Sequence, residues 1–158
     1  MKQKTKGFTL VELVMVLVLV GILSSFAASL FATRDNYDQR IVADFVVSAV
    51  RQAQQTALAR STDNVAQLQL SNSGSEWLGR ISAQGGTVHT QSMDRHTFSL
   101  HGGTDMAAAC SSLPSLPLQI GFDGDGGLTS GQNYRLCVPS RLEVCVSASG
   151  YAYVGSCL

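Results

Sequence analysis

Residues 13–32 read LVMVLVLVGILSSFAASLFA, a run of twenty residues without a charged side chain. A helix that crosses the hydrocarbon core of a bilayer needs about twenty such residues. Lys2, Lys4 and Lys6 precede the run, and the positive-inside rule places basic residues of this kind on the cytoplasmic side. The stretch therefore predicts a transmembrane helix, with everything after Arg34 on the far side of the membrane.

A cleaved secretory signal is the alternative for this segment. Such a signal has a short apolar core that ends at a small-residue cleavage site, and Ala27-Ala28-Ser29 offers one. Two observations favour the membrane helix: the apolar run is long for a signal core, and Glu12 stands near its start. An acid at membrane depth costs about 2.5–3.5 kcal/mol on insertion scales and tends to mark a functional position with a partner. Glu12 is therefore a candidate functional residue.

The sequence KGFTLVELVMVLVLVGIL, residues 6–23, resembles the leader and helix of type IV prepilins and type II secretion pseudopilins. In that family a prepilin peptidase removes a short basic leader after a glycine, and the new N-terminal residue, often phenylalanine, is N-methylated. A glutamate follows at the fifth mature position. The resemblance implies cleavage between Gly7 and Phe8, methylation of Phe8, and an assembly role for Glu12 as the fifth mature residue.

The charges of this motif suggest how cleavage could lead to assembly. Cleavage after Gly7 removes all three lysines of the leader, so the apolar helix loses its cytoplasmic anchor and can leave the bilayer. The new amine on Phe8 is a cation for Glu12, which lies four residues along on the same helical face. Between subunits, Glu12 of an incoming protein would pair with the Phe8 amine of its neighbour. In low dielectric such a pair fixes register more than it adds stability.

After the apolar run the pattern changes to an amphipathic helix and then to strands. Apolar residues recur every three or four positions between Ile41 and Leu58, which predicts a helix with one buried face. Later segments alternate apolar and polar residues between glycine-rich turns, and the last three predict an antiparallel meander. We expect an α+β fold in which a long N-terminal helix packs on an antiparallel sheet. The expected parts are a leader (1–7), a transmembrane and assembly helix (8–33), an amphipathic helix (34–61) and a β-rich head (62–158).

The part beyond the membrane resembles one subgroup of that family, the GspH/FimT-type minor pseudopilins. The similarity lies in the helix of residues 40–61 and in the segments 120–131 and 144–155. It implies a structural subunit that primes or caps a type IV pilus. The implied partners are prepilin peptidase, other major and minor pilins, the inner-membrane assembly platform and the inner membrane, with the head in the periplasm. A minor pseudopilin of a type II secretion system shares these features and stays open as the alternative.

Four cysteines, Cys110, Cys137, Cys145 and Cys157, all follow the membrane segment. Their position predicts an oxidising compartment in which disulfides persist. Four cysteines allow three connectivities. Cys137 and Cys145 are equidistant from Arg141, and a hairpin turning there would set them opposite each other. We favour Cys137–Cys145 with Cys110–Cys157; a zinc site is disfavoured because no C-x-x-C pair is present.

Asp123 and Asp125, in the sequence DGDGG, are a weak calcium candidate. An EF-hand is excluded because the third acid is missing and Tyr134 stands at the twelfth position. A glycine-rich turn capped by its own aspartates is the favoured interpretation. We expect no metal and no cofactor. The histidines match no standard ligand spacing and are expected in surface or sheet roles; they are His89, His96 and His101.

Composition and motifs disfavour two further classes of function. Charged residues make up 14% of the chain and the formal net charge is +0, so the basic excess of a nucleic-acid binder is missing. A DNA-binding or adhesive tip module is therefore the less favoured alternative, and no nucleic-acid partner is expected. Its basic candidates are scattered: Arg80, Arg95, Arg135 and Arg141. The sequence has no nucleophile elbow, P-loop or H-E-x-x-H motif, so we expect a structural subunit and not an enzyme.

Overall fold

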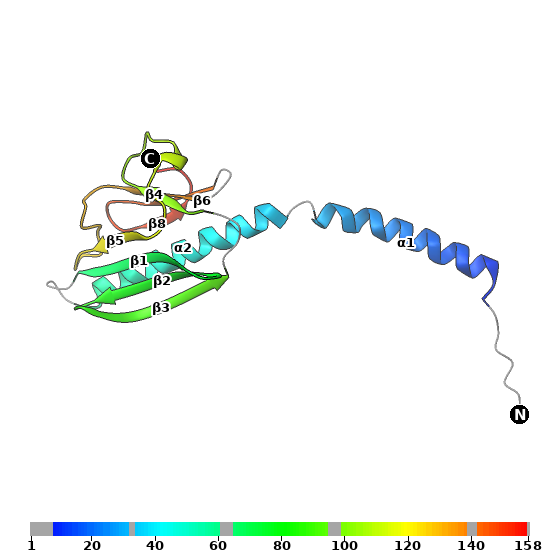
Figure 1. Cartoon of the computed structure of the whole chain (residues 1–158), viewed down its shortest axis with the longest axis horizontal. Helices are drawn as coiled ribbons and strands as arrows, with labels where there is room; N and C mark the ends of the chain where they lie inside the picture. The colour runs from blue at the N-terminus through cyan, green and yellow to red at the C-terminus, as the bar shows by residue number, and fades with distance from the viewer. Residues whose placement is uncertain (1–7, 32–33, 61–64, 95–98, 139–141, 158) are drawn as a thin grey trace, which may run out of the picture. The chain divides into compact units, whose positions relative to one another are not determined.

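The computed structural model describes residues 8–31, 34–60, 65–94, 99–138 and 142–157. The chain divides into two compact units, Met1–Tyr37 and Asp38–Leu158. Helix α1 (Leu10–Phe31) belongs to the first unit, and most of helix α2 (Arg34–Leu58) belongs to the second (Figure 1). The predicted long helix is described as two elements, α1 and α2, because residues 32–33 between them lie outside the described residues.

The second unit is α+β, as predicted, but its strands form two sheets instead of one. The strands and the short helix η1 have these bounds: β1 (Ala66–Ser73), β2 (Glu76–Ala83), β3 (Gly86–Asp94), β4 (His101–Gly103), η1 (Cys110–Ser112), β5 (Leu118–Phe122), β6 (Tyr134–Val138), β7 (Leu142–Val146) and β8 (Ala152–Val154). One four-stranded sheet has the order β3-β2-β1-β5, and the other has the order β4-β6-β7-β8. All the pairings are antiparallel, and β6-β7-β8 is the predicted C-terminal meander.

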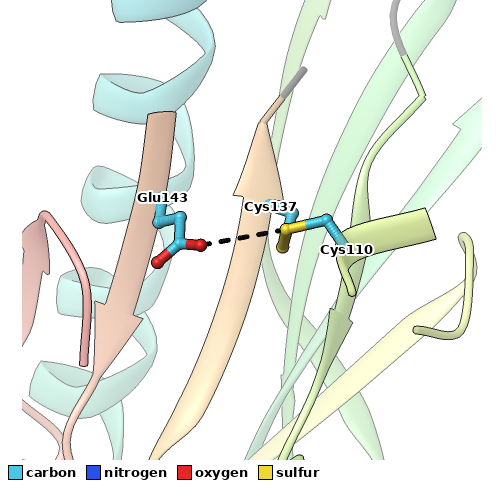
Figure 2. Close-up of side chains that lie close together, drawn as sticks. All are labelled: Cys110, Cys137 and Glu143. Carbon is cyan, nitrogen blue, oxygen red and sulfur yellow. Dashed lines mark hydrogen bonds between the residues drawn. A yellow bond between two sulfur atoms is a disulfide. The ribbon is translucent and has the colours of Figure 1, made fainter. Parts of the chain in front are cut away.

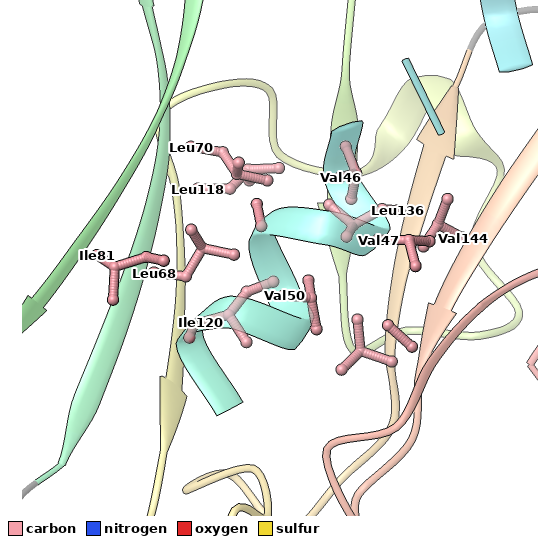
Figure 3. Close-up of a cluster of buried hydrophobic side chains, with 14 of the residues drawn as sticks. Val46, Val47, Val50, Leu68, Leu70, Ile81, Leu118, Ile120, Leu136 and Val144 are labelled. Atoms are coloured by element: carbon pink, nitrogen blue, oxygen red, sulfur yellow. The ribbon is translucent and has the colours of Figure 1, made fainter. Parts of the chain in front are cut away.

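Helix α2 lies between the two sheets and supplies the centre of the core. Figure 3 shows Val46 and Val50 of α2 among side chains from both sheets. Leu68, Ile81 and Ile120 come from the first sheet, and Leu136 and Val144 from the second. Val46 and Val50 are completely buried, and burial of one such side chain contributes roughly 1.5–3 kcal/mol. This packing explains the apolar periodicity between Ile41 and Leu58, because the helix contacts a sheet on each side.

The C-terminal half of α2 is tied to two glycine loops. The Gln54 side-chain amide donates to the carbonyl oxygens of Gly126, at 3.0 Å, and Ser149, at 3.2 Å. Gly126 and Gly150 have φ angles of 80° and 83°, a region that favours glycine. A β-carbon on Gly150 would lie 1.9 Å from the Gly126 carbonyl oxygen. The loops approach each other this closely only because glycine occupies position 150.

Candidate functional site

Thr9 and Glu12 form a reciprocal cap at the start of α1. The Thr9 backbone N–H and hydroxyl donate to Glu12 Oε2 at 2.9 and 3.0 Å, and the Glu12 N–H donates to Thr9 Oγ1 at 3.3 Å. This is the capping box, in which two otherwise unpaired backbone donors of a helix N-terminus are satisfied by side chains. Reasoning from the sequence missed Thr9, although the T-x-x-E spacing before an apolar run is its signal.

The structure brings Thr9 to the candidate residue Glu12. The predicted partner of Glu12, the amine of Phe8, exists only once the leader has been removed, so their pairing stays a prediction. Phe8 is 79% exposed. Gly7 and the leader of residues 1–7 lie outside the described residues, and the cleavage site therefore also stays a prediction.

The large apolar side chains in the first part of α1, up to Leu23, are exposed. Between Leu10 and Leu23 each of them is at least 49% exposed. In the second unit, by contrast, apolar side chains of α2 from Val42 onward are part of a buried core. Apolar surface of this extent marks a site of contact with a membrane or another protein.

Within the described residues we find no helix whose length and apolar character suffice to cross a membrane. The transmembrane segment that the sequence predicts is thus not confirmed.

All four cysteines form disulfides, but the favoured pairing was wrong. The bonds join Cys110 to Cys137 and Cys145 to Cys157, with Cα–Cα distances of 5.8 and 5.1 Å. In the β6–β7 hairpin Cys137 lies opposite Glu143, a register two residues away from one symmetric about Arg141. Cys137 and Cys145 are therefore diagonal neighbours. Diagonal positions are about 7–8 Å apart, beyond the usual reach of a disulfide.

Glu143 lies beside the Cys110–Cys137 disulfide (Figure 2). Its Oε1 is 3.9 Å from Cys110 Sγ, the pair joined by the dashed line in Figure 2. These three residues are close enough together to resemble a metal site. The two sulfurs are bonded to each other, however, and metal ligation by cysteine requires free thiolates. The cluster is a structural bridge, in which the disulfide fastens η1 to β6.

Arg135 is engaged in internal contacts of the head. Its guanidinium lies 3.5 Å from Glu143 Oε1 and donates to the carbonyl oxygens of Asp105 and Ala108. It therefore connects β6 to β7 and to the loop before η1. Of the other basic candidates for DNA binding, Arg80 is exposed on β2, and positions 95 and 141 lie outside the described residues. The described residues give DNA binding no added support.

Asp123 caps its own loop, as the favoured interpretation predicted. Its Oδ1 accepts hydrogen bonds from the N–H groups of Asp125, at 3.1 Å, and Gly127, at 2.8 Å. The Asp123 N–H in turn donates to the Gly127 carbonyl oxygen at 2.9 Å. Asp125 is exposed. The loop is thus held by hydrogen bonds between its own backbone and the Asp123 carboxylate. That it binds no calcium stays a prediction.

The histidines have separate environments. His89 is exposed on β3, whereas His101 on β4 contacts the Leu113 carbonyl oxygen through Nδ1 at 3.0 Å and the Ser99 hydroxyl through Nε2 at 3.1 Å. His96 lies outside the described residues. These contacts agree with the predicted roles at the surface and in the sheet.

Comparisons with known proteins agree with these features. Residues 2–28 match the family described as the prokaryotic N-terminal methylation motif. The chain is similar in fold to the type IV minor pilin FimU of Pseudomonas aeruginosa, with TM-score 0.51 and 12% identity over 77% of this chain and 90% of that one. A second crystal form of FimU gives TM-score 0.48 and 12% identity over 73% and 91%.

No curated protein sequence matches the chain significantly. At 12% identity the likeness to FimU concerns the fold alone. The findings show two things: an N-terminal methylation motif over residues 2–28, and a fold similar to that of FimU over 77% of the chain.

Proposed function

We propose that this chain is a minor pilin, a precursor that prepilin peptidase cuts between Gly7 and Phe8 and whose mature form enters or primes a type IV pilus. The match of residues 2–28 to the N-terminal methylation motif carries the proposal. The pilin-like fold of the head and the exposed apolar side chains of α1 support it.

The mechanism begins in the inner membrane, where residues 8–33 anchor the precursor and the head faces the periplasm. Prepilin peptidase removes the leader, and Phe8 becomes an N-methylated terminal amine. Glu12 then pairs with the Phe8 amine of a neighbouring pilin as the inner-membrane assembly platform moves the subunit into the filament. Thr9 supports this role, because its hydrogen bonds hold the Glu12 carboxylate at the N-terminal end of α1.

The head serves as a rigid structural module in this proposal. Two disulfides and a core shared by α2 and both sheets fix it, as a subunit exported from the cell requires. The chain also resembles, over its whole length, a minor prepilin of the mannose-sensitive haemagglutinin pilus. Service in a pilus of that kind is the finer proposal, and the comparisons give it no support of their own.

A clean deletion strain tests the proposal. Surface pili are counted by electron microscopy, and protein secretion is assayed from the same cultures. We expect loss of pili, normal secretion, and recovery of pili on complementation. Intact pili with blocked export would overturn the pilus assignment and make the chain a minor pseudopilin of a secretion system.

A further inference from the structure

Strand β3 is an edge strand of the first sheet, and among the described residues no further strand pairs with it. β2 is its neighbour in the strand order, and Figure 1 shows β3 at the outer side of that sheet. An edge strand presents unpaired backbone N–H and C=O groups that another chain can pair with. Natural edges are commonly protected by lysine, by proline or by a short strand. β3 has nine residues, GTVHTQSMD, with no lysine, arginine or proline. A bulge opposite Ile81 and Ser82 is the one feature of this strand that can hinder pairing at its edge.

Next to this edge, helix α2 offers a surface on which an added strand could pack. β3 is attached to α2 by Gln91, whose side chain contacts the Ser48 hydroxyl at 3.3 Å and the Phe45 carbonyl oxygen at 3.5 Å. Further along, an open hollow of about 300 Å³ lies between Val88 of β3 and the exposed side of α2. A strand added beyond β3 would place alternate side chains over this hollow and over α2.

The charges of β3 and of the neighbouring surface favour a second copy of β3 as the added strand. Asp94, at the C-terminal end of β3, is the strand's one charged residue. In an antiparallel pair the second copy's Asp94 comes to the Val88 end of this strand, where Arg60 is the one charged residue among those lining the hollow. Two-fold symmetry repeats the contact, so the pair gains two oppositely charged contacts and places no like charges opposite each other.

We propose that β3 pairs antiparallel with β3 of a second copy of this chain, which joins the two first sheets into one continuous sheet. A single nine-residue edge buries less than the roughly 1,200–2,000 Å² of a stable interface. The dimer is therefore weak and forms where subunits are concentrated. It depends on neither the leader nor Glu12.

Sedimentation of the full chain in detergent micelles over a range of concentrations tests the pairing, together with hydrogen exchange of the β3 amides. Thr90, exposed near the middle of β3, is replaced in Thr90→Lys, which sets like charges near the two-fold axis. We expect this variant to raise the dimer dissociation constant at least tenfold. The matched control is Gln119→Lys, which adds the same charge at an exposed position of β5 in the same sheet and should leave the constant unchanged.

A charge exchange tests the register. Asp94→Lys and Arg60→Glu should each weaken the dimer several-fold, and the double variant should recover most of the loss. A monomer at every concentration would overturn the proposal, as would a dimer that Thr90→Lys leaves intact, since that dimer would associate through a surface other than β3. Protection of the β3 amides that appears only after another pilin is added would show a different occupant and would equally overturn it.

Discussion

Replacement of Gly150 by alanine should damage the head severely, because position 150 combines an unfavourable backbone angle with a close contact. The φ angle is 83°, and the new β-carbon would lie 1.9 Å from the Gly126 carbonyl oxygen and 2.7 Å from Gln54 Nε2. The Gly126 carbonyl is backbone and cannot simply turn away. The two loops must separate, and the hydrogen bonds from Gln54 to Gly126 and Ser149 are then strained or lost.

The expected loss of unfolding free energy is the sum of the cost of the backbone angle and the cost of the lost hydrogen bonds. An L-residue in the left-handed region costs about 1–2 kcal/mol, and each lost hydrogen bond costs about 1 kcal/mol. Together they predict a loss of about 3–4 kcal/mol, a large share of the roughly 5–15 kcal/mol that stabilises a typical domain. Gly131→Ala is the matched control, because Gly131 has a φ angle of 64° but a β-carbon there would have no atom within 4 Å. Gly131→Ala should lower the unfolding free energy only by the cost of the backbone angle, about 1–2 kcal/mol.

Urea unfolding of the oxidised full chain in detergent measures both variants. Trp77 is the single tryptophan and is 2% exposed in the core, so its fluorescence reports unfolding of the head. With an m-value of about 2 kcal/mol per molar urea, the midpoint for Gly150→Ala should lie about 1 M below that of Gly131→Ala. Equal midpoints would show that backbone angle alone governs position 150 and would refute the close approach of the two loops.

Three further predictions concern processing, assembly and the disulfides. Glu12→Ala should leave cleavage normal but reduce incorporation into filaments, because the charge pair between subunits is lost; efficient incorporation on immunoblots of sheared filaments would count against that pair. Gly7→Val should leave uncut precursor in the membrane, and a mature product beginning at Phe8 would refute the assigned cleavage site. Paired Cys145→Ser and Cys157→Ser changes open a loop of sequence separation 12 and should lower the unfolding free energy by about 3 kcal/mol; an unchanged urea midpoint would contradict this.

The elements that the sequence predicted best are those with a strong local pattern. The second helix was expected over residues 34–61 and is Arg34–Leu58, because its apolar positions repeat at the helical period. The meander β6-β7-β8 was expected from alternating segments separated by turns and is confirmed. The turn capped by Asp123 was expected from its glycines and aspartates and is confirmed.

Features that depend on pairing between distant segments were not predicted. The division into two sheets follows from the pairing of β1 with β5, about fifty residues apart in the sequence, and no local pattern encodes it. Most of β3 is exposed, so its residues lack the alternation that identifies a half-buried strand. The disulfide pairing failed for a related reason: symmetry about Arg141 misplaced the register by two residues, and a shift of that size replaces every cross-strand partner.

The most direct test of the central claim is mass spectrometry of the N-terminal peptide of this chain in sheared, purified filaments. We expect the chain to be present in the filament fraction, with Phe8 as its first residue and an N-methyl group on that residue. Recovery from filaments of a peptide that still contains Lys2–Lys6 would contradict cleavage before Phe8. Absence of the chain from filaments of a strain that makes it would contradict its role as a pilus subunit.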